Sequence, residues 1–447
     1  MTGTTEPDQT SPSSHVRWRS QLWWNSAGQL AGTLLARLSR AGGILLAARF
    51  LGPATFGIVA TGLAAYELLR VATEAGLDTR LIRRVAPSPA GGRQELKRTI
   101  GLKTRIALLV VVVAIAAAWI TGGRQSSVVT AGLALGVFGL AAAGSVQALA
   151  TARLEAPRLV PYQAVAGVLF CGGVAGTAIL THSDTLTALA VGLADLVGGG
   201  IQLGYAMHPR DTSSAAPPAW SAWEALRESW PVGAVNVMST AYGRLGVGVL
   251  AVSWGATAVA QYGVSYRVVE AFLMAAAAVS ASAFAVTARL DAAGSDAGSA
   301  TALLDHLLGR LALLTLAIAG AIIAGASLLP VALGEQYRGA VATTQVLAFA
   351  LPPMFLNGIL TAHLYGRGRF KTVMRIGIVN LITNAALVAL LIPTTGPLGA
   401  AFAIVGTESA NTMWQSSVAG LGPRAWTWWV AALCFGAGLC MFLVYRA

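Results

Sequence analysis

Long uncharged apolar stretches constrain the fold of this chain more than any other feature. Residues 106–120 read IALLVVVVAIAAAWI, and residues 128–150 carry no charge at all. A helix needs about 20 apolar residues to cross the hydrocarbon core of a bilayer, and such stretches recur along almost the whole chain. Transmembrane strands are short and alternate apolar with polar residues. The pattern therefore predicts an all-α, polytopic membrane protein rather than an outer-membrane barrel.

The composition agrees with a surface that faces lipid. Of the 447 residues, 55% are hydrophobic and 11% are charged, whereas soluble domains carry about 25% charged residues. The net charge of +12 follows from the basic residues that membrane proteins collect in cytoplasmic loops, so we expect no nucleic-acid partner. The cysteines Cys171, Cys434 and Cys440 lie in apolar stretches without metal-ligand spacing. We therefore expect no metal site and no cofactor.

The loops between the apolar stretches predict the orientation of the chain. Windows of about 20 residues predict about 13 spans. If alternate loops are compared, one side carries most of the Arg and Lys residues, whereas the other carries only Arg49, Arg124, Arg338 and Arg446. Because positive charge stays inside, the N-terminus is predicted to be cytoplasmic.

Two similar halves are predicted around a central cavity, with one extra C-terminal helix. FGIV, from Phe56, and YGVS, from Tyr262, each follow a short turn that contains glycine, Gly52 or Gly255. The polar, proline-rich stretch after the sixth predicted span divides the halves. The predicted segments are a disordered cytoplasmic tail at 1–21, an N-terminal six-helix lobe at 22–207, a cytoplasmic linker at 208–226, a C-terminal six-helix lobe at 227–420, and an extra transmembrane helix at 421–447.

Charged residues inside predicted spans are the candidates for function, because charges at membrane depth face a partner or a water-filled cavity. They gather in the first, second, seventh and eighth spans. Arginine binds phosphate oxygens in a bidentate manner, so an anionic substrate is indicated, and the glutamates can pair with the arginines when no ligand is bound. The substrate-binding candidates are Arg37, Arg40, Arg70, Arg244 and Arg267, with Glu67, Glu74 and Glu270 as supporting acidic residues.

A purely structural role stays open for each of these residues, as pairing with a neighbouring helix would explain any one of them. Glu67, Arg70 and Glu74 have spacings that place them on one helical face, so the glutamates could serve only to neutralise Arg70. For Asp195 and Glu408, in the sixth and twelfth spans, the structural role is favoured.

Enzymatic motifs are missing from the sequence. GRGRFKT, at 366–372, lacks the spacing of a nucleotide-binding P-loop, and no G-x-S-x-G occurs. The outer loops are short and nearly uncharged, which argues against a membrane-embedded glycosyltransferase or polymer ligase. We therefore expect a protein that is not an enzyme and has no catalytic residues.

Four segments in order resemble one known family. They are ARFLGPATFG (48–57), AGLDTRLIRRVA (75–86), QYGVSYRVVEAF (261–272) and LIPTTGPLGAAFAIVGTE (391–408). Together they resemble bacterial polysaccharide flippases of the multidrug/oligosaccharidyl-lipid/polysaccharide exporter superfamily. The resemblance implies a multi-pass protein of the bacterial cytoplasmic (inner) membrane. It also implies a flippase that moves polyprenyl-pyrophosphate-linked oligosaccharides between leaflets by alternating access, for cell-surface polysaccharide biosynthesis.

The resemblance also implies roles for particular residues. Arg37, Arg70 and Arg267 look similar in position to cavity arginines of the lipid II flippase branch, which makes them candidates for contacting the pyrophosphate. Gly246 stands where many sugar flippases have an acidic residue, and a thirteenth span is atypical. The implied partners are a lipid-linked oligosaccharide, membrane lipid and a polysaccharide polymerase. The alternative is a multidrug exporter of the same superfamily, although cationic drugs would favour carboxylates over arginines.

Overall fold

The computed structural model describes residues 12–86, 92–207, 220–292, 297–367, 369–421 and 426–446. Throughout these residues the regular structure is helical, and no strand occurs among them. The α-helices are α1 (Pro12–Glu74), α2 (Leu77–Val85), α3 (Gly92–Ala152), α4 (Ala156–Thr181), α5 (Asp184–Met207), α6 (Ala222–Ser253), α7 (Gly255–Ala292), α8 (Ala297–Gly325), α9 (Leu329–Leu333), α10 (Gly339–Ala348), α11 (Leu351–Gly366), α12 (Phe370–Val418) and α13 (Trp426–Arg446). Short 3₁₀ turns, η1 (Ala326–Leu328) and η2 (Glu335–Tyr337), flank α9.

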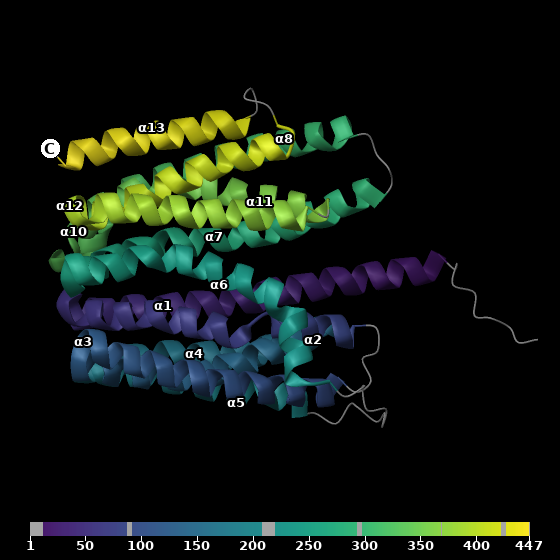
Figure 1. Cartoon of the computed structure of the whole chain (residues 1–447), viewed down its shortest axis with the longest axis horizontal. Helices are drawn as coiled ribbons and strands as arrows, with labels where there is room; N and C mark the ends of the chain where they lie inside the picture. The colour runs from purple at the N-terminus through teal and green to yellow at the C-terminus, as the bar shows by residue number, and fades with distance from the viewer. Residues whose placement is uncertain are drawn as a thin grey trace, which may run out of the picture.

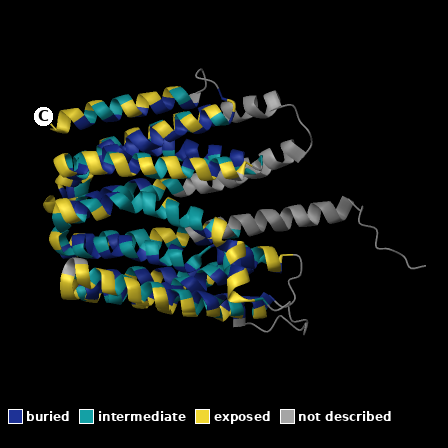
Figure 2. Ribbon diagram, in the orientation of Figure 1, coloured by how far each residue is buried: buried dark blue, intermediate teal, exposed yellow. Residues whose placement is uncertain are grey.

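The long helices lie side by side with roughly parallel axes (Figure 1). One end of the bundle carries α2, and we call it the α2 end; the C-terminus of the chain lies at the opposite end (Figure 1). Exposed residues lie mostly on the outside of the bundle and buried ones between the helices (Figure 2). Many exposed residues are large and apolar, such as Leu109, Ile120 and Leu180, which is the surface expected of a protein in lipid.

α1 is a hairpin of two arms rather than one straight rod. The Arg40 guanidinium lies 5.6 Å from the centre of the Tyr66 ring, although 26 residues of straight helix would separate them by about 39 Å. The chain folds back at Gly52, whose φ of 73° favours glycine, and Pro53 begins the second arm. α12 bends in the same way at Gly396, and α3 at Gly123. We call the end of the bundle where α1 folds back the Gly52 end.

The helices form two groups, as the sequence predicted. α1 to α5 contact chiefly one another and form the first lobe, whereas α6 to α12 form the second lobe. The first lobe is held by a core that includes Leu133, Val137 and Phe170, and the second by one that includes Leu347 and Val405. The extra helix α13 packs on α8, α10, α11 and α12.

The structure and the sequence give different numbers of membrane spans. Among the described residues, nine helices are long and apolar enough to span a membrane, or ten if the bent pair α10 and α11 is one span. The prediction of about 13 spans counts the two arms of α1 and of α12 separately, and it includes α7, whose span is described only in part. The arms on either side of Gly52 and Gly396 explain the rest of the difference.

Two helices begin inside segments that the sequence predicts to be a tail and a linker. α1 begins at Pro12, so its helical backbone extends into the predicted tail at 1–21, of which residues 1–11 lie outside the described residues. The predicted linker at 208–226 also lies largely outside them, and α6 begins within it, at Ala222. The lobe limits 22–207 and 227–420, and the helix at 421–447, stay predictions.

Candidate functional site

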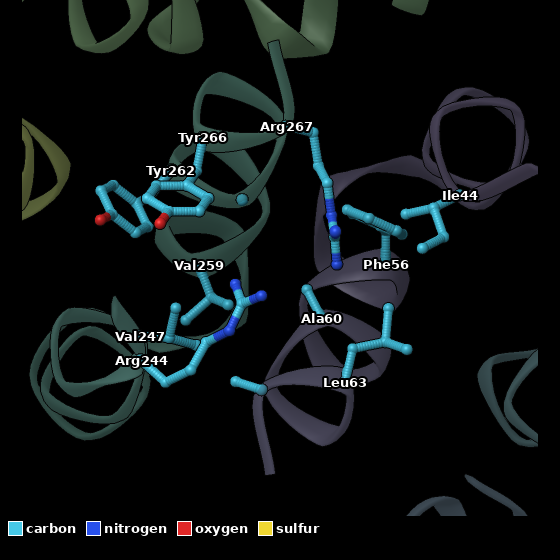
Figure 3. A pocket seen from close by; sticks show the side chains of 12 residues that line it. Ile44, Phe56, Ala60, Leu63, Arg244, Val247, Val259, Tyr262, Tyr266 and Arg267 are labelled. Atoms are coloured by element: carbon cyan, nitrogen blue, oxygen red, sulfur yellow. The ribbon is translucent and has the colours of Figure 1, made fainter. Parts of the chain in front are cut away.

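A small cavity lies between the two lobes and is lined by side chains of both. The first lobe contributes mostly apolar side chains from both arms of α1: Ile44, Phe56, Ala60, Leu63 and Ala64. The second lobe contributes α6 and α7, with Arg244, Val247, Val259, Tyr262, Gly263, Tyr266 and Arg267. In Figure 3 the side chains of Arg244 and Arg267 converge from two helices on the space beside Ala60 and Leu63. The cavity is thus an apolar space into which two guanidinium groups project.

Arg244 and Arg267 share one acidic partner. Nη1 of Arg267 donates to Glu270 at 2.8 Å, and Nη2 of Arg244 lies 3.8 Å from the same carboxylate. The Arg244 guanidinium also lies over the ring of Tyr266, 5.5 Å from its centre. Glu270 stands one turn after Arg267 on α7, which brings the two side chains together. A single carboxylate therefore offsets two cavity arginines.

The second arm of α1 extends the cavity face toward the α2 end. Leu63 lines the cavity, and Glu67, Arg70 and Glu74 follow it at helical spacings on the same face. Nε of Arg70 donates to Glu67 at 2.9 Å, and its Nη1 lies 3.9 Å from Glu74. The expected pairing of glutamates with arginines is thus confirmed for this group and for Glu270.

Glu67 connects the charges of the two lobes. It interacts electrostatically with Arg70 and Arg40 of the first lobe, and with Arg244 and Arg267 of the second. The Glu67 side chain is largely buried, whereas Arg70 is about one-third exposed. Charges are weakly screened where water is scarce, so a carboxylate in this place balances the charge of the surrounding arginines.

Arg37 is exposed and lies on α1 seven residues before Ile44. Seven residues return a helix to nearly the same face, about 10 Å along its axis, so Arg37 continues the face of cavity-lining Ile44 toward the α2 end. Of the predicted arginines, the structure thus places Arg244 and Arg267 in the cavity lining, whereas Arg37 and Arg70 lie beyond it on helical faces that continue toward the α2 end.

Arg40 belongs to a different group inside the first lobe. Its Nη1 donates to both carboxylate oxygens of Asp195, on α5, at 2.6 and 2.7 Å. Tyr66 donates to the same carboxylate at 2.7 Å, and the guanidinium packs over Phe170, 4.6 Å from the ring centre. Arg40 does not line the cavity. As a substrate-binding residue it is thus the least favoured of the predicted set, because Asp195 already balances its charge.

The sequence reasoning passed over the tyrosines. Tyr262 and Tyr266 line the cavity and lie within QYGVSYRVVEAF, a stretch in which the sequence predicts only the charged Arg267 and Glu270 as candidates. The spacing of four residues puts both rings on one helical face. Tyr66 and Tyr242 each donate to a buried carboxylate. A tyrosine in a span needs a partner for its hydroxyl, which is the signal that could have found them.

The lobes touch at both ends of the cavity. At the Gly52 end, Tyr337 donates to the carbonyl of Ala48 at 2.7 Å, and a Cβ at Gly57 would overlap the carbonyl of Ala256. At the α2 end, Nε of buried Arg80 donates to Glu228, on α6, at 2.7 Å. The cavity thus lies between two seams at which the lobes touch.

Several solved structures of membrane transporters have a fold similar to that of this chain. Solved structures of the same fold include a lipid II flippase, MurJ, in an inward closed conformation, with a TM-score of 0.71, 10% identity, and coverage of 92% of this chain and 91% of that one. They also include an inward-facing multidrug resistance MATE transporter of the MOP superfamily, with a TM-score of 0.66, 14% identity, and coverage of 93% and 95%. The fold is therefore that of the MOP-superfamily transporters.

A MOP-superfamily transporter from Pyrococcus furiosus, described by the reverse polarity of its binding pocket, has a TM-score of 0.60 at 15% identity, with coverage of 90% of this chain and 95% of that one. No curated protein sequence matches the chain. The family model described as polysaccharide biosynthesis protein matches residues 22–290. The chain belongs to this family of membrane proteins.

Proposed function

We propose that this protein flips a polyprenyl-pyrophosphate-linked oligosaccharide across the bacterial cytoplasmic membrane. One observation carries the proposal: Arg244 and Arg267 of the second lobe project into an apolar cavity at the lobe interface. On the first lobe, Arg70 lies on the helical face that continues from cavity-lining Leu63. A pyrophosphate could accept hydrogen bonds from Arg244 and Arg267 together, because guanidinium groups bind phosphate oxygens in pairs. The family of the chain and its likeness to a lipid II flippase support a lipid-linked substrate.

Substrate entry would require an exchange of partners. Glu67 pairs with Arg70 and Glu270 with Arg267, and the pyrophosphate would take the place of these carboxylates. The displaced carboxylates would repel the pyrophosphate, which weakens binding and favours release, as transport requires. The sugar headgroup would cross through the cavity while the polyprenyl chain stays in the bilayer.

Alternating access would follow from the two seams. With the N-terminus in the cytoplasm, as the charge of the loops predicts, the α2 end faces the cytoplasm. The seam at Arg80 and Glu228 would open to admit the substrate, and the seam at Ala48 and Tyr337 would open to release it. In this scheme the protein is a transporter rather than an enzyme, and its product would pass to a polysaccharide polymerase outside.

The test is flipping of a fluorescent undecaprenyl-pyrophosphate-linked oligosaccharide in liposomes that hold the purified protein. We expect Arg244→Ala and Arg267→Ala to lower the flipping rate at least about tenfold, since each removes a charge-assisted contact of about 1.5–3 kcal/mol. Arg338→Ala is the matched control, because the Arg338 side chain is 78% exposed and lies outside the cavity. Flipping at the wild-type rate in both cavity variants would overturn the assignment.

The alternative, a multidrug exporter, is tested in the same liposomes. Two carboxylates, of Glu67 and Glu270, pair with arginines beside the cavity, and a cationic drug would favour them. Efflux of ethidium that depends on Glu67, without flipping of the lipid, would support the exporter. Flipping of the lipid without ethidium efflux would support the flippase.

A further inference from the structure

The second lobe contains a buried carboxyl group that none of the cavity contacts explains. Glu408, on the second arm of α12, is 6% exposed. Tyr242 donates to its Oε1 at 2.6 Å, and Nδ2 of Asn357 donates to its Oε2 at 2.7 Å. Asn411, one turn further along α12, also hydrogen-bonds the carboxyl group. These partners are all neutral, and none of the described ion pairs includes Glu408.

A carboxylate in such a place is costly in its charged form. Glu408 lies near the middle of the arm that runs from Gly396 to Val418, so about 15 Å of helix separates it from either end. Neutral hydrogen bonds offset only part of the cost of removing a charge from water. Binding one proton removes the charge while leaving the hydrogen-bonding groups in place.

A polar column leads from Glu408 toward the α2 end. Gln415, two turns further along α12, donates to Asn411 at 3.0 Å and accepts from Thr361, on α11, at 3.0 Å. Asn411 and Gln415 are both buried. Polar side chains inside a membrane protein mark pathways for ions and protons, so the column makes the stretch between the α2 end and Glu408 more polar than the apolar lobe around it.

Glu408 is also linked to the cavity, through Tyr266. Tyr266 interacts electrostatically with both Glu408 and Arg244, and the Arg244 guanidinium lies over its ring. Further titratable groups on the described elements packed around Glu408 include Tyr242 and Arg244 on α6, Tyr262, Arg267 and Glu270 on α7, His363 and Tyr365 on α11, and Cys434, Cys440 and Tyr445 on α13. A change of charge at Glu408 would therefore alter the potential at a cavity arginine.

We propose that Glu408 is a reversible proton-binding site whose occupancy is sensed in the cavity at Arg244. A hydronium ion in water at the α2 end gives up a proton and is left as water, and the proton forms an O–H bond with a carboxylate oxygen of Glu408. By linkage, proton binding and ligand binding in the cavity influence each other equally. This link to transport rests on the proposed function, whereas the protonation itself does not.

The test is an infrared pH titration of the full-length protein in lipid bilayers, without any substrate. A protonated carboxylic acid has a C=O stretching band that tyrosine, histidine and cysteine do not share. We expect a band at low pH that disappears as the pH rises, that is lost in Glu408→Gln and that is kept in Glu270→Gln, the arginine-paired control. Tyr242→Phe should shift the frequency of the same band, which keeps the test open if Glu408→Gln does not fold.

Three results would overturn the site. The first is a band that persists in Glu408→Gln, and the second is the absence of any pH-dependent carboxylic acid band. The third is loss of the band at fixed pH when sodium replaces N-methylglucamine, because the ligand would then be a sodium ion. Because no lipid-linked substrate is present, a failed flipping assay leaves this result intact, and a failed titration leaves the flipping assay intact.

Discussion

Each lobe contains one deeply buried carboxyl group that a tyrosine holds, but the two groups differ in how their charge is balanced. Asp195 of the first lobe accepts from Tyr66, and Glu408 of the second accepts from Tyr242. The remaining partner in the first lobe is the guanidinium of Arg40, and the remaining partners in the second are the amides of Asn357 and Asn411. Similar geometry with a different partner thus turns one carboxyl group into a fixed structural charge and leaves the other free to exchange a proton.

The difference extends to the surroundings of each carboxyl group. Arg40 belongs to α1 and Asp195 to α5, and the guanidinium packs over Phe170 of α4, so one charge pair joins three helices. Glu408 instead adjoins a polar column and the tyrosine that contacts Arg244. We infer that the first lobe uses its charge for stability and that the second keeps its charge adjustable.

Among these predictions the largest loss of stability is expected for Asp195→Asn. The change leaves Arg40 charged and mostly buried without its partner, which costs about 3–5 kcal/mol when a buried pair is broken. Chemical unfolding of the purified protein in bilayer discs measures the loss. The double variant Arg40→Met/Asp195→Leu is the control, and it should regain most of the stability because no charge is left unpaired. A loss below about 1 kcal/mol in Asp195→Asn would show that the pair is not structural.

Much of the fold was predictable because a bilayer restricts the alternatives. Apolar stretches predict helices, and Gly52-Pro53 predicts the turn between the two arms of α1. The place of each side chain around the helix axis was harder. Arg37, Arg40 and Arg70 look alike as charges in apolar helices, yet Arg40 faces Asp195, more than 150 residues away. Contacts between distant helices decide which arginine is already paired, and no local pattern encodes them.

An intermediate loss of stability is expected when the tyrosine that holds each buried carboxyl group is changed to phenylalanine. Tyr66→Phe removes a hydrogen bond to a charged carboxylate, so it should cost about 1.5–3 kcal/mol. Tyr242→Phe removes one from a carboxyl group that is neutral when protonated, so it should cost about 0.5–1.5 kcal/mol at low pH. Unfolding of both variants at the same low pH gives the difference. Equal costs would remove the distinction between the two sites.

The smallest effect is expected for Glu408→Gln. Glutamine keeps the shape of the side chain and one acceptor for Tyr242, and it loses one hydrogen bond with Asn357, so the stability should change by about 1 kcal/mol or less. Because a neutral amide stands where a proton would otherwise have to bind, the variant should also lose the dependence of stability on pH that wild type shows. Unfolding at several pH values, with Glu270→Gln as the control, measures both quantities. A loss of stability as large as that of Asp195→Asn would mean that Glu408 is held in its charged form. The buried carboxyl groups of both lobes would then be structural charges.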